Sequence, residues 1–268
     1  MHDNYDVKGR VLRIDQRLQS VESLKNLQHL HDHDSFDIFD IEFLPSGQVV
    51  QQTSYTFGAK VHGSKRFIYA ERGELLRTLE FGGAGSSLRS TDFRCDSEGR
   101  CVGWTGFDPS GALTRRCVRQ YAGKLLVSSA TSDAKGAAIR QEDFEYAASN
   151  LVKSGCRYYG PDGTLCEMWT SHHDTQGRLI ETFGLTAEGA SLGDGRHTYE
   201  YDADGRKIKT WSFNDLSDDK VPNAVTVFEY KSDEIGNWVE RHAFHRFRSA
   251  SRWTERITNR KLTYFPSP

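Results

Sequence analysis

A four-residue pattern, Asp-x-x-Gly, recurs along the whole chain and limits what it can fold into. Asp at the start of a type I turn accepts hydrogen bonds from the turn backbone, and the closing Gly takes the left-handed conformation of a bulged hairpin. One copy would mean little, but a dozen predict an array of β-hairpins. The Asp copies are Asp6–Gly9, Asp96–Gly99, Asp108–Gly111, Asp133–Gly136, Asp174–Gly177, Asp202–Gly205 and Asp233–Gly236. Turns with another first residue are Leu44–Gly47, Ala70–Gly73, Ala147–Asn150, Gly160–Gly163 and Thr186–Gly189.

The residues that flank these turns support the same interpretation. In such a hairpin the residue before the turn lies opposite the second residue after the glycine. These positions combine an aromatic with an aliphatic residue, a pair that stabilises a sheet by about 0.2–1 kcal/mol relative to Ala–Ala. The predicted pairs are Tyr5 with Val11, Phe43 with Val49, Tyr69 with Leu75, Phe107 with Leu113, Tyr146 with Val152, and Tyr159 with Leu165.

The spacing of the turns predicts the connectivity. Between residues 99 and 205 the turn residues follow one another at intervals of 12 to 16, which leaves strands of about eight residues. Strands joined in this way form an up-and-down antiparallel meander. One short helix is predicted over residues 15–28, with a capping strand segment as the alternative, because apolar residues recur there at intervals of three and four. Those residues are Ile14, Leu18, Val21, Leu24 and Leu27.

The segment Tyr199-Glu200-Tyr201-Asp202-Ala203-Asp204-Gly205-Arg206 resembles the YD repeat of RHS-type proteins, whose unit runs Tyr-x-Tyr-Asp-x-x-Gly-Arg/Asn. The run from Tyr5 to Arg10 is similar, and so is Phe228 to Trp238 with a longer turn. The resemblance is best over residues 199–265. It implies a continuous antiparallel sheet coiled into a spiral or open shell. It implies no catalytic residues, because the repeat itself has none.

The expected fold class is therefore all-β, with one YD-repeat-like domain over residues 1–268 and one short N-terminal helix. The strands form an antiparallel meander of hairpins coiled into a spiral or open shell. A β-propeller is the alternative, since four strands of this length would make a blade. The blade signatures of kelch and WD40 repeats are absent.

Composition excludes some partners. A net charge of −2 gives no reason to expect nucleic acid or an anionic membrane as a partner. No apolar run approaches the roughly 18 residues that a membrane span needs. The polar N-terminus shows no signal-peptide pattern, which indicates a cytoplasmic protein or a chain trimmed to its mature form.

The chain has five cysteines, so at least one thiol is free unless it pairs between chains. The turn Asp96–Gly99 places Cys95 opposite Cys101, at a separation that suits a disulfide. We therefore expect a disulfide between these two residues and a location outside the cytoplasm: secreted, periplasmic or at the cell surface.

A cluster of histidines follows the predicted helix. On a strand, His29, His31 and His33 would share one face, and neutral imidazoles in that arrangement bind zinc or nickel. The same segment also fits a polar surface loop, in which case the protein has no cofactor. The metal interpretation makes the chain a metal-dependent hydrolase, with Asp32 and Asp34 as further candidate ligands.

Aromatic residues supply the other candidate site. An exposed aromatic side chain on a rigid sheet stacks on a sugar or on the apolar surface of a partner. The candidates for this role are Trp104, Trp169, Trp211, Tyr199 and Tyr201. We expect the last three to share one open face of the sheet.

The leading functional hypothesis is a non-catalytic binding or scaffold protein with a glycan or protein ligand. The alternatives are the hydrolase and a toxin-neutralising or inhibitory partner, the latter implied only by the RHS resemblance.

Overall fold

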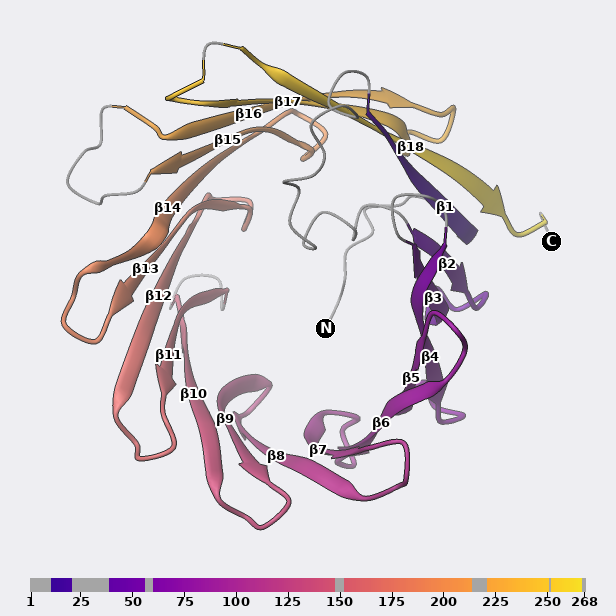
Figure 1. Cartoon of the computed structure of the whole chain (residues 1–268), viewed down its shortest axis with the longest axis vertical. Helices are drawn as coiled ribbons and strands as arrows, with labels where there is room; N and C mark the ends of the chain where they lie inside the picture. Colours follow the sequence, from indigo (N-terminus) through magenta and orange to yellow (C-terminus); the bar gives the residue numbers. More distant parts are fainter. Residues whose placement is uncertain are drawn as a thin grey trace.

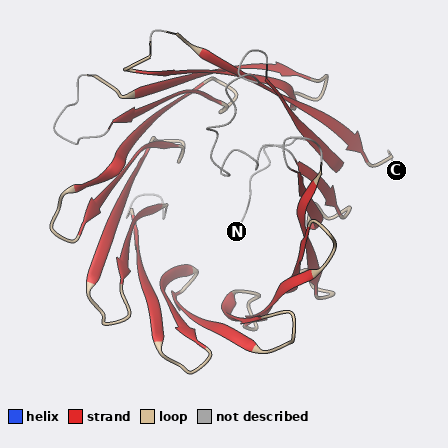
Figure 2. Ribbon diagram, viewed as in Figure 1, coloured by secondary structure: helices blue, strands red, loops and turns tan. Residues whose placement is uncertain are grey.

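The computed structural model describes residues 11–20, 39–55, 60–147, 152–213, 221–250 and 252–266, and within these ranges it contains eighteen strands and no helix (Figures 1 and 2). The first nine strands are β1 (Val11–Ser20), β2 (Phe39–Phe43), β3 (Val49–Tyr55), β4 (Val61–Tyr69), β5 (Leu75–Gly82), β6 (Ser87–Cys95), β7 (Cys101–Phe107), β8 (Leu113–Ala122) and β9 (Leu125–Asp133). The others are β10 (Ala138–Tyr146), β11 (Lys153–Tyr159), β12 (Leu165–His173), β13 (Leu179–Thr186), β14 (Ser191–Tyr201), β15 (Lys207–Phe213), β16 (Ala224–Ser232), β17 (Trp238–Phe247) and β18 (Thr254–Tyr264).

The sheet closes on itself into a barrel. Each strand from β2 to β18 pairs antiparallel with the next, and β1 pairs with both β18 and β2. Figure 1 shows the resulting ring, in which the first and last strands lie side by side. The predicted spiral or open shell is therefore wrong, and so is the β-propeller alternative. The predicted meander is present, but its two ends are hydrogen-bonded to each other.

The predicted helix over residues 15–28 is also wrong where the structure describes it. Residues 15–20 belong to β1, and residues 21–28 lie outside the described ranges. Ile14 and Gln16 are both buried on one face of this strand, so an alternation of period two replaces the expected helical period. In the described part of the chain, no helix could cross a membrane.

The turns form at the predicted positions wherever the structure describes them; Asp6–Gly9 and most of Ala147–Asn150 lie outside the described residues. In the described ranges, twelve glycines have positive φ, between 59° and 93°. At the turn after β6, one carboxylate oxygen of Asp96 accepts hydrogen bonds from the N–H groups of Glu98 and Arg100, both at 3.0 Å. The N–H of Gly99 donates to the carbonyl of Asp96 at 3.0 Å. Asp therefore recurs because it satisfies N–H groups that the tight turn leaves without a strand partner.

Most of the predicted pairs are present. Phe43 pairs with Val49, Tyr69 with Leu75, Phe107 with Leu113, and Tyr159 with Leu165. Tyr146 pairs with Lys153 rather than with Val152, because the N–H of Ala147 bonds to the Val152 carbonyl and keeps that residue in the turn. Tyr5 lies outside the described residues.

Arginine and tyrosine link each hairpin to its neighbour. Nε of Arg178 lies 2.6 Å from the carboxylate of Asp174 in its own turn, and the guanidinium covers the ring of Tyr201 at 5.2 Å. The Tyr201 hydroxyl donates to the carbonyl of Leu179 at 2.7 Å. Arg100 and Arg206 repeat this arrangement on later tyrosines. The Tyr-Asp-x-x-Gly-Arg sequence is therefore a set of contacts that ties successive hairpins together along one rim.

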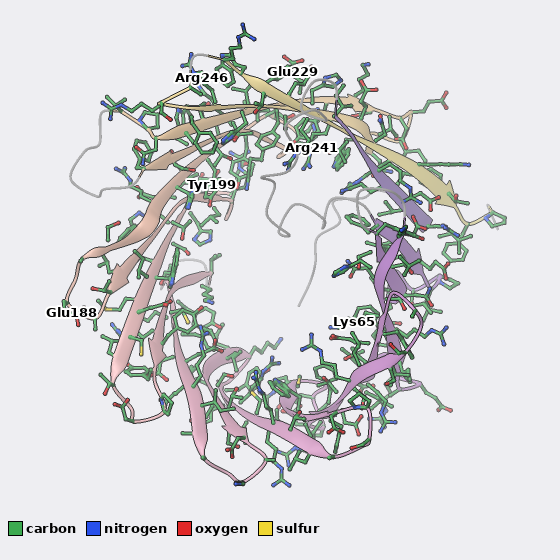
Figure 3. All side chains as sticks on the ribbon, viewed as in Figure 1. Lys65, Glu188, Tyr199, Glu229, Arg241 and Arg246 are labelled. Carbon is green, nitrogen blue, oxygen red and sulfur yellow. The ribbon has the colours of Figure 1, made fainter. Side chains whose placement is uncertain are left out.

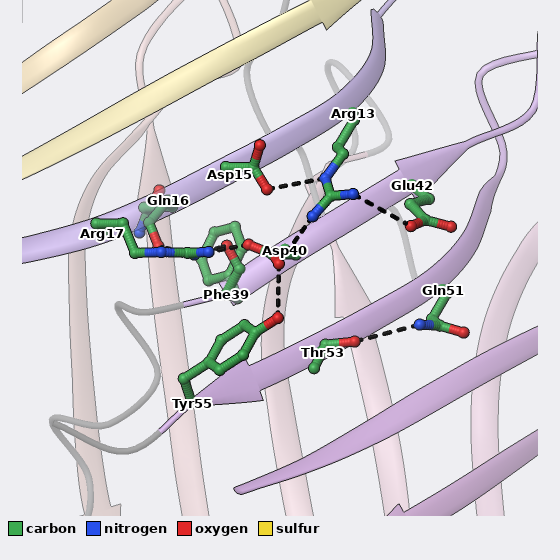
Figure 4. Close-up of polar contacts among 10 residues, drawn as sticks. All are labelled: Arg13, Asp15, Gln16, Arg17, Phe39, Asp40, Glu42, Gln51, Thr53 and Tyr55. Atoms are coloured by element: carbon green, nitrogen blue, oxygen red, sulfur yellow. Dashed lines mark hydrogen bonds and ion pairs between the residues drawn. The ribbon is translucent and has the colours of Figure 1, made fainter. Parts of the chain in front are cut away.

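The seam at β1 closes the barrel through contacts on both faces. On one face Ile14 and Ile41 are fully buried and pack with Leu262. On the other face, Asp40 accepts a hydrogen bond from Arg17 at 2.6 Å and another from the Tyr55 hydroxyl at 2.6 Å (Figure 4). Only four residue pairs join β1 to β2, so side-chain contacts carry much of this junction.

The electrostatics of the seam predict a pH dependence of stability. Burial raises the pKa of Asp40, but hydrogen bonds from Arg17 and Tyr55 outweigh it and hold the pKa below its usual value. A carboxylate with a lowered folded-state pKa contributes its full stability above its unfolded pKa, and loses it as the pH falls through the folded value. We expect Asp40→Asn to lower the free energy of unfolding by about 2 kcal/mol at pH 7, measured by urea denaturation.

The same substitution should flatten the loss of stability on acidification below about pH 4. Asp92→Asn is the matched control, because Asp92 pairs with Arg77 at a more exposed position and should lose less than about 1 kcal/mol. Equal losses in the two variants would contradict the role given to the seam.

Candidate binding site on the inner wall

The sheet has an inner and an outer wall, and the pairing register assigns strand residues to one or the other. The side chains of Lys65, Tyr199 and Arg241 point to the inside of the ring, whereas Glu229 and Arg246 point outward (Figure 3). Residues paired across antiparallel strands lie on the same face, and successive residues alternate. Following the pairs from Lys65 around to Tyr199 gives one consistent assignment.

The outer wall carries ion pairs well inside the strands. Nη2 of Arg77 lies 2.7 Å from the Asp92 carboxylate, between β5 and β6. Glu181 on β13 accepts from Nε of Arg196 at 2.6 Å and lies 2.6 Å from Nδ1 of His172. Burial raises the pKa of Glu181, but the hydrogen bonds from His172 and Arg196 lower it further than that. The outer wall is thus a charged surface with both signs interspersed.

The inner wall is basic. Ten Lys or Arg and four Asp or Glu occupy its described strand positions, although the whole chain has a net charge of −2. The basic residues are Lys65, Arg89, Arg115, Arg119, Arg140, Lys153, Lys207, Arg241, Arg256 and Arg260. The acidic residues are Glu80, Asp133, Glu142 and Glu167.

Aromatic rings and cations alternate along part of this wall. Nζ of Lys207 on β15 lies 4.2 Å from the ring centroid of Tyr199 on β14. On β17, the guanidinium of Arg241 lies 5.7 Å from the ring of Phe228 and 5.3 Å from that of Trp238. The guanidinium of Arg260 on β18 lies 3.4 Å from the centroid of the Trp238 ring. We call these residues the basic aromatic strip: Tyr199, Lys207, Phe228, Trp238, Arg241 and Arg260.

Like charges meet in the strip. Burial lowers the pKa of Lys207, and the positive charge of Arg241 lowers it further. Among the described residues Lys207 makes no ion pair with a carboxylate. Lys207 therefore adds a positive charge to the inner wall close to that of Arg241.

A second group of covered rings lies on β10 and β11. The guanidinium of Arg140 is 3.8 Å from the Tyr158 ring, and Nζ of Lys153 is 4.5 Å from the Phe144 ring. Burial, then a hydrogen bond with Cys156, raises the pKa of Tyr158 to about 12. Tyr158 is therefore a neutral side chain at physiological pH.

The structure divides the predicted aromatic residues between the two walls. Trp104 and Trp169 lie on the inner wall, since they pair with Cys117 and Cys156. Tyr199 and Tyr201 also lie inside. Trp211 lies outside, where Lys209 covers its ring at 4.5 Å, so the prediction that it shares a face with the two tyrosines is wrong.

Sequence reasoning did not select most of the strip. Lys207 is the second residue after Gly205, and Trp238 is the second residue after Gly236. Both therefore occupy the position that pairs with the end of the preceding strand. The repeated turn could therefore have predicted that Lys207 and Trp238 occupy equivalent positions in their hairpins. Arg241 and Arg260 carry no such signal, because their contacts depend on the order of strands in the ring.

The predicted metal cluster of His29, His31 and His33, with Asp32 and Asp34, lies outside the described residues. Among the residues that the structure does describe, no group of three or more His, Cys, Asp or Glu side chains could hold a metal ion. The zinc site and the hydrolase that depends on it stay predictions.

Comparisons with known proteins leave the family open. No protein-family model matches the chain, and no curated protein matches it. A porin-like protein from Bacteroides uniformis superposes with a TM-score of 0.48 at 12% identity, over 94% of this chain and 98% of the other. A porin-like protein from Bacteroides vulgatus gives a TM-score of 0.31 at 12% identity, over 97% and 100%.

A complex titled TcdB2-TccC3-Cdc42 matches with a TM-score of 0.33 at 13% identity, over 90% of this chain but 13% of that chain. Because all three TM-scores are below 0.5, neither this complex nor the porin-like proteins assign this chain a function. The YD-repeat resemblance stays an interpretation of the sequence.

The cysteine pair provides a test of the predicted location. Cys95 and Cys101 face each other across β6 and β7, as the turn spacing predicts, and both are free thiols in this structure. Burial and the neighbouring thiol raise the pKa of Cys95. We expect a disulfide between them in protein made in an oxidising compartment, seen as a cross-linked peptide by mass spectrometry. Exposed Cys166 should remain alkylatable. Two reduced thiols in protein from that compartment would contradict this expectation.

Proposed function

We propose that this chain is a non-catalytic binding protein that holds a protein or glycan ligand against the inner wall of its barrel. The observation that supports the proposal most directly is the basic aromatic strip. Five consecutive strands, β14 to β18, contribute its rings and cations. Rigid aromatic and arginine side chains are the groups that dominate binding energy at interfaces. The binding surface is thus concave and enclosed, in place of the open sheet face expected from the sequence.

The width of the ring supports an accessible inner wall. About eight strands give a barrel whose interior side chains fill it, whereas 16 to 18 strands leave a channel. Arg89 keeps 67% of its side chain exposed and Lys65 keeps 37%, although both are on the inner wall. Solvent reaches these positions, and a ligand would meet charged groups there.

The outer wall supports an aqueous environment for the barrel. A barrel embedded in lipid carries an apolar outward band, and an outward Arg at the middle of the bilayer costs about 2–4 kcal/mol. Here Arg196 lies at the middle of β14 on the outer wall, paired with Glu181. The extracytoplasmic location and the absence of a membrane span stay predictions.

A flotation experiment tests the environment of the barrel. Because its outer wall is charged, we expect the protein to purify without detergent and to stay at the bottom of a sucrose gradient with phosphatidylcholine liposomes. Co-flotation that survives a carbonate wash would show instead that the outer wall contacts lipid.

Tryptophans on opposite walls test where the ligand binds. We expect Trp104→Ala and Trp169→Ala, on the inner wall, to weaken binding by about tenfold in a glycan and protein screen, since each removes a rigid aromatic contact. Trp211→Ala on the outer wall is the matched control and should bind like the unmodified protein. Loss of binding in the control alone would move the site to the outer wall. Substrate turnover that ends on mutation of a clustered His or carboxylate would contradict the non-catalytic proposal.

A toxin-neutralising or inhibitory partner remains the second candidate. Such a protein would also bind without catalysis, and the enclosed wall suits the capture of a segment of another protein. The same tryptophan variants report on it, with the partner protein as the ligand.

A further inference from the structure

Two aromatic rings of the inner wall have no cation over them. Among the described residues, no Lys or Arg lies over the indole of Trp104 or of Trp169, whereas the rings of Phe144 and Tyr199 are covered at 4.5 and 4.2 Å. Both tryptophans are half-buried, so part of each indole is open to the inside of the ring. An uncovered aromatic ring is a surface on which the apolar face of a sugar stacks.

The Trp169 indole is held in place by two contacts. Its Nε1 donates a hydrogen bond to a carboxylate oxygen of Glu167 at 3.3 Å. The ring also lies directly above Gly184 on the paired strand β13, because a Cβ at that glycine would be 3.0 Å from Cε2 and Cζ2 of the indole. A glycine inside a strand marks a place where another group approaches the backbone closely. The indole is therefore a fixed platform on the sheet.

A row of polar side chains crosses four strands beside this platform. Ser171 on β12 pairs with Thr182 on β13. His197 on β14 pairs with Thr182 and with Ser212 on β15. Nδ1 of His197 lies 3.0 Å from Oγ of Ser212, whereas the Ser171 and Thr182 hydroxyls bond to no other described residue. We call these four residues the hydroxyl row. Its hydroxyl groups both donate and accept hydrogen bonds, as those of a sugar do.

The middle of this part of the wall contains no Lys, Arg, Asp or Glu. Along the described pairs that join β12 to β15, the inner residues of these types are Glu167 near one rim and Lys207 near the other. An anionic ligand would therefore meet no ammonium or guanidinium group at the hydroxyl row. A purely apolar ligand would leave the hydroxyls of the row without partners, which costs free energy.

The closed sheet also disfavours an extended peptide as the ligand. A peptide that binds as a strand uses the unpaired N–H and C=O groups of a sheet edge. Each of the strands β12 to β15 is hydrogen-bonded to a neighbour on both sides (Figure 1). Side chains rather than backbone groups therefore contact a ligand on this wall, and here they are hydroxyl, imidazole and indole groups, which match the hydroxyls and the apolar face of a sugar.

We infer that the inner wall of β12 to β15 binds an uncharged oligosaccharide. One pyranose ring stacks on Trp169, and the sugar hydroxyls exchange hydrogen bonds with the hydroxyl row. The inference rests on the proposed binding function and selects glycan over protein as the ligand. It places the ligand between Trp169 and Tyr199, where the basic aromatic strip begins.

Two threonines on neighbouring strands provide a matched pair for the test. Thr182 belongs to the hydroxyl row on the inner wall, whereas Thr198 pairs with Trp211 on the outer wall. The probes are uncharged hexasaccharides, namely maltohexaose, cellohexaose, xylohexaose and chitohexaose. Binding to the full chain is measured by isothermal titration calorimetry, with hexagalacturonate and a Gly–Ser–Tyr peptide as comparison probes.

We expect at least one uncharged hexasaccharide to bind. Trp169→Ala should weaken its binding by about tenfold or more, because it removes the stacking platform. Thr182→Val keeps the shape of the side chain without its hydroxyl and should weaken binding by about threefold or more. Thr198→Val should change affinity by less than about twofold, as a substitution outside the site would. Raising NaCl from about 50 mM to about 500 mM should also change affinity by less than about twofold, because salt screens charged contacts.

A second variant keeps the test independent of the folding of Trp169→Ala. Trp169→Phe retains an aromatic ring above Gly184 and should bind more tightly than the alanine variant. Circular dichroism of every variant checks that the sheet is intact.

The outcomes separate this inference from the proposed function. Binding of hexagalacturonate or of the peptide that is tighter than that of every uncharged hexasaccharide, and that Trp169→Ala weakens, would overturn the uncharged glycan and keep the proposed function. Hexasaccharide binding that Trp104→Ala weakens and Thr182→Val does not would overturn the site on β12 to β15. Failure of every hexasaccharide to bind would overturn the inference alone. Binding that no inner-wall variant weakens would overturn both.

Discussion

The structure depends on one junction, the placement of β1 between β18 and β2. A strand at the edge of a sheet exposes a row of unpaired N–H and C=O groups, and only closure removes both edges. Nine residue pairs hold β1 to β18, but four hold it to β2. The buried Ile14 and Ile41 and the Asp40 network reinforce the short side of this junction. The other seventeen strand pairings join strands that follow one another in the sequence. The pairing of β1 with β18 joins residues about 250 apart, so its loop-closure entropy cost is the largest in the fold.

Closure of the barrel also gives the two faces of the sheet different surroundings and different side chains. In an open sheet both faces meet the same solvent, whereas a ring gives its two faces different surroundings. The outer wall pairs its charges with each other, as in Arg77 with Asp92 and Arg196 with Glu181. The inner wall also contains ion pairs, such as Lys65 with Glu80, but its Lys and Arg residues outnumber its acidic residues, and several of them lie over aromatic rings, as Lys207 does over Tyr199. The same alternating strand therefore supplies a balanced surface outside and a basic, aromatic surface inside.

Local features of the fold follow from the sequence because they depend on nearby residues. Turn glycines and most of the pairs beside them, such as Tyr69 with Leu75, were predictable from Asp-x-x-Gly spacing. Closure was not, because an open spiral and a closed ring have the same turns and the same local pairs. The helix over residues 15–28 was predicted from spacings of three and four, yet the burial of Ile14 and Gln16 in β1 follows the period of a strand.

The candidate site was harder to predict for a geometric reason. After each turn the register shifts by one residue, as between Glu200 and Tyr201 against Lys207 and Lys209. Counting alternate residues from the turn therefore assigns Tyr199 and Trp211 to one face, whereas the bulge puts them on opposite walls. A single shifted residue exchanges the two faces of everything beyond it. The pairs beside the turn are thus predictable, while the wall on which a more distant aromatic residue lies is not.

The basic aromatic strip contains an arrangement that does not favour stability, and such arrangements help to locate a functional site. Lys207 beside Arg241 is unfavourable in the free protein, because two cations share a partly buried surface without a carboxylate beside Lys207. A sequence selected only for stability would place an acidic residue at one of these positions, as the outer wall does with Glu181 beside Arg196. Departures of this kind concentrate at functional sites, where the missing partner is supplied by a ligand. The hairpin array makes the departure tolerable: each strand contributes one or two residues to the strip, and the hydrogen bonds on both sides of every strand hold the backbone in place whichever side chains face inward.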